Sequence, residues 1–334
     1  MNKTILSLFS ATLLGFVVSA SASSEEKVNQ QIDARPGGKL IVEVDFGTVN
    51  VNAGTDSKVT VDAFRRINFG DEAAEKEYLA EAPVAVTANG NTITVRARSS
   101  KEARHHHFHH TSMDARYTVR VPKNFSAELN TGGGDLSATE LAGDIRADSG
   151  GGDLTFSHTQ GAVSAKSGGG SIKLDGCDGA TEVKTGGGDI VLANGHGVLR
   201  ARTGGGSVQV RTLAGDADVA TGGGELTLQK IDGAIAAETS GGAITASVTT
   251  APLKEISLES SGGSIDLVIP RTAAADITAE TGDGGITSDL PLAVTKTGGN
   301  HLRGKLNGGG TPVVLRTSSG SISINSASPA TAGR

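Results

Sequence analysis

Apolar residues in the middle of the chain recur every 18 positions. One ladder consists of Leu136, Leu154, Ile172, Ile190, Val208, Leu226 and Ile244. A second ladder, two residues later, consists of Ala138, Phe156, Leu174, Leu192, Val210, Leu228 and Ala246. Side chains of a β-strand alternate between two faces, so residues two apart point to the same side. Both ladders are therefore predicted to line one interior.

A second strand-like segment completes each repeat. Its inward positions are Ile145, Val163, Thr181, Leu199, Ala217 and Ile235, each followed two residues later by Ala or Val. The corner between the two segments holds Leu141, Thr159, Cys177, Gly195, Leu213 and Ile231. This row places Cys177 in the same interior.

Glycine marks the turns of the repeat. A Gly-Gly-Gly triplet begins at residues 132, 150, 168, 186, 204 and 222, and a single glycine follows in each repeat. Ser or Thr precedes every triplet, and these stacked hydroxyls are expected to hydrogen-bond along the axis. Triplets at this interval would break any helix. The pattern predicts an all-β protein, a parallel β-solenoid (β-helix) whose 18-residue coils each advance about 4.8 Å.

The N-terminal segment has the pattern of a secretory signal peptide. Lys3 supplies the positive charge, residues 5–18 are mostly apolar, and Ala20-Ser21-Ala22 forms a small-residue cleavage site. The apolar run is too short to span a bilayer, and no later run is long enough. The mature chain is therefore predicted to be exported, either periplasmic or secreted to the cell surface, without a membrane span.

The regions around the repeat are predicted from weaker patterns. Alternating residues indicate strands between residues 38 and 68 and again near 92–95 and 117–121, and residues 71–80 indicate one short helix capped by Asp71. After residue 250 the register loosens but continues. The predicted organisation is a signal peptide (1–22), an N-terminal linker (23–36), an N-terminal β region or cap (37–125), the regular solenoid (126–250), irregular C-terminal coils (251–325) and a tail (326–334).

These features together resemble a bacterial family of Gly-rich β-strand-repeat envelope proteins that carries the label "putative adhesin". The matching features are the exported N-terminus, the opening strand at residues 38–42, the segment 117–122, the Gly-rich coils and the closing segment 318–324. The resemblance covers residues 37–325. It implies a β-solenoid in the cell envelope, and it implies neither an activity nor catalytic residues.

Composition and charge narrow the function classes. The chain has 48 glycines, 3% aromatic residues and no Trp, and its formal net charge is -6. A modestly acidic chain of this kind is not expected to bind nucleic acid. Cys177 is the only cysteine, so an intramolecular disulfide is excluded, and the thiol is expected to be buried.

A histidine-rich tract is the main candidate for chemistry. Five imidazoles fall within six positions, at His105, His106, His107, His109 and His110. Such a tract can supply ligands for Zn, Cu or Ni, and its charge changes between pH 5 and 8. The alternative is a solvated loop without a specific ligand.

The outward positions of the repeat offer a second candidate. Lys166, Lys184 and Arg202 occupy equivalent places in successive coils, and Arg200 lies beside Arg202. This cationic ridge (Lys166, Lys184, Arg200 and Arg202) is a candidate binding site for a polyanion such as an envelope polysaccharide. The alternative is an ordinary solvated face with Glu182 as an ion-pair partner.

Other kinds of site lack their residue patterns. The residue after each triplet alternates between acid and serine, which does not match the calcium motif of β-rolls, and no triplet continues into a phosphate-binding Gly-Lys-Ser/Thr. The outward acids form no common column that would give a glycosidase its two carboxylates. No catalytic residue and no cofactor are therefore predicted.

The sequence favours a structural, adhesin-like interaction module of the envelope, with an envelope or surface glycan or protein as its partner. One alternative is a metal- or pH-responsive periplasmic protein that uses the His105–His110 loop. A second alternative is a carbohydrate-active β-helix enzyme. The sequence does not predict the oligomeric state.

Overall fold

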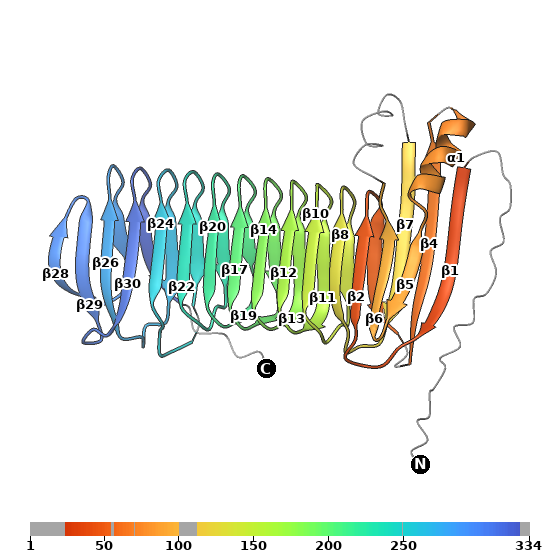
Figure 1. The fold of residues 1–334 in the computed structure, drawn as a ribbon. Coiled ribbons are helices and arrows are strands. Elements are labelled where there is room, and N and C mark those ends of the chain that lie inside the picture. Colours follow the sequence, from red (N-terminus) through yellow and green to blue (C-terminus); the bar gives the residue numbers. More distant parts are fainter. Residues whose placement is uncertain (1–23, 55–56, 70, 100–111, 249, 328–334) are drawn as a thin grey trace, which may run out of the picture.

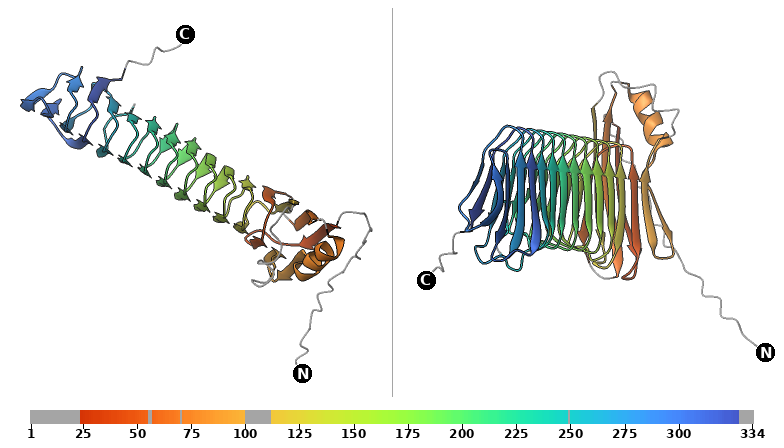
Figure 2. Two further views of the ribbon diagram at one scale, coloured as in Figure 1. Left: turned by 90° about the horizontal axis from the view of Figure 1, so that it is seen from above. Right: turned by 90° about the vertical axis from the view of Figure 1, so that its left-hand side faces the viewer.

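The computed structural model describes residues 24–54, 57–69, 71–99, 112–248 and 250–327. The chain winds into a long rod of flat coils, and each coil places one strand in each of two facing sheets (Figures 1 and 2). The predicted signal peptide at 1–22 and the histidine tract at 105–110 lie outside the described residues.

Within the described residues, one sheet, sheet A, has 16 strands and the facing sheet, sheet B, has 15. In spatial order, sheet A contains β1 (Ser24–Asp33), β4 (Lys58–Asn68), β7 (Ser112–Val121), β3 (Thr48–Ala53), β9 (Leu136–Thr139), β11 (Leu154–Gln160), β13 (Ile172–Asp178), β15 (Ile190–Ala193), β18 (Val208–Val210), β21 (Leu226–Gln229), β23 (Ile244–Ser247), β25 (Ile265–Ile269), β31 (Ile322–Ser326) and β27 (Ile286–Ser288). The short strand β16 (Gly195–His196) pairs with β13, and β19 (Leu213–Ala214) pairs with β16.

Sheet B contains, in spatial order, β28 (Ala293–Gly298), β29 (His301–Leu306), β26 (Ala275–Thr281), β30 (Thr311–Thr317), β24 (Ile256–Ser260), β22 (Ile235–Thr239), β20 (Ala217–Thr221), β17 (Leu199–Thr203), β14 (Thr181–Thr185), β12 (Val163–Ser167), β10 (Ile145–Ser149), β8 (Ser126–Thr131), β2 (Lys39–Val44), β6 (Thr92–Ala97) and β5 (Ala85–Asn89). The helix α1 (Glu72–Glu81) lies at the N-terminal end of the rod (Figure 1).

The predicted ladders stack in parallel register. Leu154 lies between Leu136 and Ile172 in sheet A, and Val163 lies between Ile145 and Thr181 in sheet B. The apolar side chains of these ladders are almost fully buried between the sheets. The β-solenoid prediction is therefore confirmed, with one continuous core along the axis.

The glycine turns are held by hydroxyl groups that bridge neighbouring coils. Ser149 Oγ donates to the carbonyl of Gly134 in the preceding coil at 2.8 Å and accepts from the N–H of Gly152 in its own coil at 3.0 Å. The same two bonds recur at Ser167, Thr185, Thr203, Thr221 and Thr239. Each buried hydroxyl therefore satisfies backbone groups of two coils.

The three glycines of a triplet differ in their structural need. A Cβ on Gly152 would lie 2.0 Å from the carbonyl oxygen of Gly134, whereas a Cβ on Gly151 would have no neighbour within 4 Å. The backbone at Gly151 also lies outside the left-handed region. A Cβ on Gly150 would likewise lie 2.0 Å from the carbonyl oxygen of Gly132. The first and third glycines are therefore required for the coils to stack, and the middle one is not.

The ends of the rod do not follow chain order. The coil formed by β2 and β3 lies between the β6–β7 coil and the β8–β9 coil, and the β30–β31 coil lies between the β24–β25 coil and the β26–β27 coil. At the N-terminal end the chain therefore adds its second coil outside the first, and at the C-terminal end it returns to insert the β30–β31 coil inside the β26–β27 coil that precedes it in the chain. The irregular coils predicted at 251–325 are present, but in the spatial order β24–β30–β26.

Two predicted boundaries differ from the structure. Most of the expected linker at 23–36 forms β1, which pairs with β4 along its whole length. Strand β1 has few apolar residues, and it is held at the edge of the sheet because Glu25 and Glu26 form ion pairs with arginines of β4. Ser326, predicted to begin the tail, ends β31 and is bound to Asp289.

The helix prediction is confirmed, with Asp71 accepting a hydrogen bond from the N–H of Ala73.

We expect Gly152→Ala to lower the free energy of unfolding by about 1–3 kcal/mol, because the new methyl group would overlap the preceding coil. Gly151→Ala is the matched control and should leave stability unchanged or raise it by up to about 1 kcal/mol, because alanine restricts the unfolded chain. Denaturant unfolding followed by circular dichroism measures both. Equal destabilisation by the two variants would contradict this account of the triplet.

A buried ion pair closes the N-terminal end. The Arg65 side chain is 0% exposed; its Nε donates to Glu26 Oε2 at 2.8 Å and its Nη2 to the carbonyl of Ala82 at 2.6 Å. Glu26 also accepts from the N–H of Val84 at 2.9 Å. The pair therefore joins β1, β4 and the chain after α1.

We expect Glu26→Gln to lower the free energy of unfolding by about 3 kcal/mol, because it leaves the buried Arg65 charge uncompensated. Glu25→Gln, on the same strand, removes a carboxylate bound to the exposed Arg66 and should have little effect. Thermal unfolding of the two variants makes the comparison. A similar loss for both would show that burial of the Arg65–Glu26 pair is not what matters.

Candidate interaction surfaces

The outer face of sheet B carries the cationic ridge. Lys166, Lys184 and Arg202 are direct partners on the neighbouring strands β12, β14 and β17, so the structure brings them into one column about 4.8 Å apart. Arg200 lies in the adjacent column, as the partner of Glu182 and Asp218. All four predicted ridge residues are therefore on one surface.

Carboxylates neutralise part of this ridge. Lys184 Nζ lies 2.6 Å from Glu182 Oε1, and Arg202 Nη2 lies 2.6 Å from Asp218 Oδ1. The Lys184 ammonium group holds the pKa of Glu182 below its usual value. Within the described residues, Lys166 has no carboxylate within ion-pair distance. Exposed pairs of this kind contribute little binding energy, so the ridge can attract a polyanion only weakly.

The column changes character after Arg202. Ala220 follows Arg202, and Glu238 and Glu259 follow Ala220. The small side chains leave a shallow depression of about 120 Å³ between the cationic and acidic parts of the face. Sheet B therefore presents a mixed, charge-segregated surface.

The outer face of sheet A widens at the N-terminal end. Strands β1, β4 and β7 have 10, 11 and 10 residues, whereas β9 to β25 along the main path of sheet A have 3 to 7 (Figure 1). Strands β1 and β4 pair antiparallel here, as do β4 and β7. The longer strands create a broad face that the 18-residue repeat does not have.

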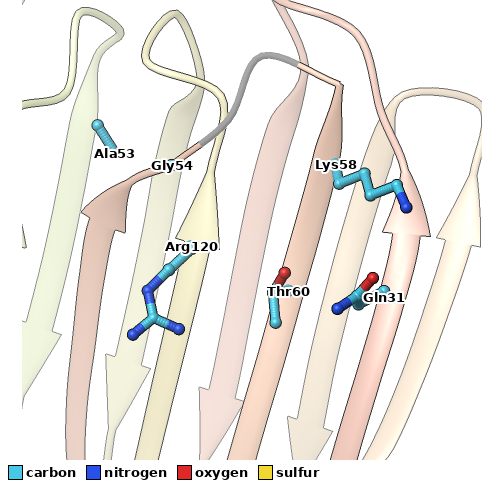
Figure 3. Close-up of a pocket in the computed structure, with 6 residues that line it drawn as sticks. All are labelled: Gln31, Ala53, Gly54, Lys58, Thr60 and Arg120. Atoms are coloured by element: carbon cyan, nitrogen blue, oxygen red, sulfur yellow. The ribbon is translucent and has the colours of Figure 1, made fainter.

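A hollow of about 490 Å³ lies on this broad face. Figure 3 shows Arg120, Thr60 and Gln31 in one row across β7, β4 and β1, with Lys58 reaching from β4 toward β1. Ala53 and Gly54, at the end of β3, leave the hollow open on one side. Its lining therefore combines four polar side chains, two of them cations, with Ala53 and Gly54, and it includes no carboxylate.

Phe64 points outward from the same face of β4. Lys27 Nζ and the Arg66 guanidinium each lie 5.5 Å from the centre of its ring, which are cation–π contacts. Neither Phe64 nor the hollow is predicted by the sequence analysis. Val59 and Val61 point inward, so the alternation of a strand that continues to residue 64 places Phe64 on the outer face. The sequence therefore contains the information needed to predict the position of Phe64.

The acids after the glycine triplets have a structural role. Asp135 Oδ1 accepts from the N–H of Asp153 at 2.9 Å, and Asp153 Oδ1 accepts from the N–H of Ser171 at 2.7 Å. Asp189 binds Ser207 in the same way. Each carboxylate therefore binds the backbone of the next coil.

The thiol of Cys177 and the phenol of Tyr117 are buried. Cys177 is 2% exposed and free, and burial raises the pKa of its thiol. Tyr117 is also buried, and burial raises the pKa of its phenol although the Arg65 guanidinium acts in the opposite direction. The predicted burial of Cys177 is confirmed.

Histidine is the next side chain to consider as a metal ligand. His196 Nδ1 lies 2.6 Å from Asp178 Oδ1 on the neighbouring strand, and both side chains are exposed. No group of three or more His, Cys, Asp or Glu side chains in the described residues could hold a metal ion. The predicted Zn, Cu or Ni ligands, His105 to His110, fall outside them.

Comparison with known proteins agrees with the fold. The family model described as Toastrack DUF4097 matches residues 38–325. The protein belongs to the Toastrack family. No curated protein matches this Toastrack chain. In its described part, no helix combines the length and apolarity needed to cross a membrane.

Several solved structures are similar to this Toastrack protein at low identity. A "putative adhesin" from Parabacteroides distasonis is 10% identical, with 90% of this chain and 97% of that chain covered and a TM-score of 0.43. A "putative adhesin" from Bacteroides fragilis is 14% identical, with 91% and 98% covered and a TM-score of 0.30. A "putative cell adhesion protein" from Clostridium sporogenes is 10% identical, with 90% and 100% covered and a TM-score of 0.25.

We expect Cys177 to resist thiol reagents in the folded protein, because burial disfavours the reactive thiolate. Reaction with a chromogenic disulfide reagent should release one thiol per chain in denaturant and almost none in native buffer. Release at the same rate in both conditions would contradict the buried position.

Proposed function

We propose that this Toastrack protein is an exported, adhesin-like interaction module of the bacterial envelope that binds its partner through the outer faces of the solenoid. The observation that carries this proposal is the pair of long outer faces. Outward side chains of neighbouring strands lie about 4.8 Å apart along each face, and their chemistry differs between the two sheets. Sheet B presents ion-paired columns, and the N-terminal end of sheet A presents an open polar face.

Rigidity supports this role. Hydroxyl bridges and parallel ladders hold each coil to its neighbours, so outward groups keep fixed distances along the rod. Many weak contacts at fixed spacing add to a strong one when the partner is also repetitive. Polysaccharides and surface arrays are partners of that kind.

The ion pairing of the outward acids also supports binding over catalysis. Asp148 lies 3.5 Å from Arg146, and Glu182 and Asp218 each bind a cation of the ridge. Carboxylates held in this way act as parts of a charged surface. On sheet B, the cationic ridge, which begins at Lys166, is the part that we assign to an anionic partner.

Location in the cell tests the proposal. An epitope tag with a protease site, placed after Arg334, should be removed from intact cells or from cells with a permeabilised outer layer. A cytoplasmic protein in the same cells serves as the control and should stay intact. Protection of the tag until complete lysis would overturn the proposal, because an envelope module cannot remain in the cytoplasm.

A further inference from the structure

The broad N-terminal face of sheet A contains two rows of outward polar side chains. We propose that this platform binds a strand of an acidic polysaccharide, with a carboxylate of the sugar chain held in the hollow between Arg120 and Lys58. This inference names the class of ligand for one surface of the protein, and it rests on the proposed function as an interaction module.

The first row crosses five neighbouring strands. Gln31 pairs in register with Thr60, Thr60 with Arg120, Arg120 with Asn52, and Asn52 with Thr139. At about 4.8 Å per strand the row spans about 19 Å. It therefore provides a straight track of hydrogen-bonding groups that is long enough for several sugar residues.

The second row runs beside the first. Asn29 pairs in register with Asp62, Asp62 with Thr118, Thr118 with Asn50, and Asn50 with Ser137. Each row thus contains four amide or hydroxyl side chains, and these groups both donate and accept hydrogen bonds. Sugar hydroxyls have the same dual character, so a track in which four of every five side chains are uncharged matches a polysaccharide better than it matches a uniformly charged chain.

The charge at the hollow selects an acidic sugar. Arg120 Nη1 lies 3.6 Å from Asp62 Oδ2, with both side chains well exposed, so this cation is only partly compensated. Lys58 has no ion-pair partner in the described residues, although Asp33 is its register partner. The two cations flank Thr60 in an open space lined partly by Ala53 and Gly54, which leaves room for a carboxylate.

A second cationic point lies along the same strands. Arg116 is the register partner of Phe64 and forms no ion pair within the described chain, whereas Arg66 and Lys27 share Glu25. Phe64 follows Thr60 by four residues on the same face, which corresponds to about 13 Å. The platform therefore has a second cationic point, which lies to the side of the two rows.

The test measures binding of polygalacturonate to the purified exported chain by calorimetry, with dextran as the neutral polymer. We expect binding of polygalacturonate only. The double substitution Lys58→Gln/Arg120→Gln should weaken it at least tenfold. The matched control, Lys173→Gln/Arg211→Gln, removes one exposed lysine and one exposed arginine from the regular coils, outside both proposed binding surfaces, and should change the affinity less than twofold.

A further variant separates the sugar track from charge alone. Asn50→Ala/Asn52→Ala keeps every charge and should weaken binding several-fold, with circular dichroism confirming that all variants fold. Absence of binding, equal losses in both charge variants, or equal affinity for single-stranded DNA would overturn the proposal. These outcomes are independent of the tag-protection experiment, so the ligand class and the envelope role can fail separately.

Discussion

The bridging hydroxyl at each glycine turn is the interaction on which the rod depends. Ser149 donates to the carbonyl of Gly134, the third glycine of the preceding triplet, and accepts from the N–H of Gly152, the third glycine of its own triplet. The equivalent residues of the other coils do the same. This bond is possible only because the coils approach so closely that a Cβ on Gly152 would lie 2.0 Å from the Gly134 oxygen. The glycine and the hydroxyl are therefore two parts of one constraint, which also keeps the apolar ladders in register.

The same constraint leaves the outward positions free. Inward residues and turn residues must repeat, whereas a column such as Lys166, Lys184, Arg202 and Ala220 changes from coil to coil without affecting the stack. Surface chemistry can therefore vary along the rod while the spacing does not. The difference between the charged face of sheet B and the polar face of sheet A follows from this freedom.

The sequence is sufficient to predict the regular coils, the helix after Asp71 and the burial of Cys177, because each depends on local spacing. It does not reveal which coils are neighbours at the ends. Periodicity identifies equivalent positions only, whereas the β6–β7 coil is added outside the β2–β3 coil and the β30–β31 coil is inserted inside the β26–β27 coil. Strand β1 is missed for another reason. Its sequence is mostly polar, and it is held by ion pairs with β4 that have no periodic signal.

The platform could not be predicted from the sequence, because it is built from residues that lie far apart along the chain. Its rows join Gln31, Thr60 and Arg120, which are adjacent only because long antiparallel strands replace the repeat at this end. A regular coil offers only short strands in sheet A, so it cannot build a hollow and a second anchor on one face. In the proposed binding role, specific recognition takes place where the repeat stops, and the regular coils supply the rigid support.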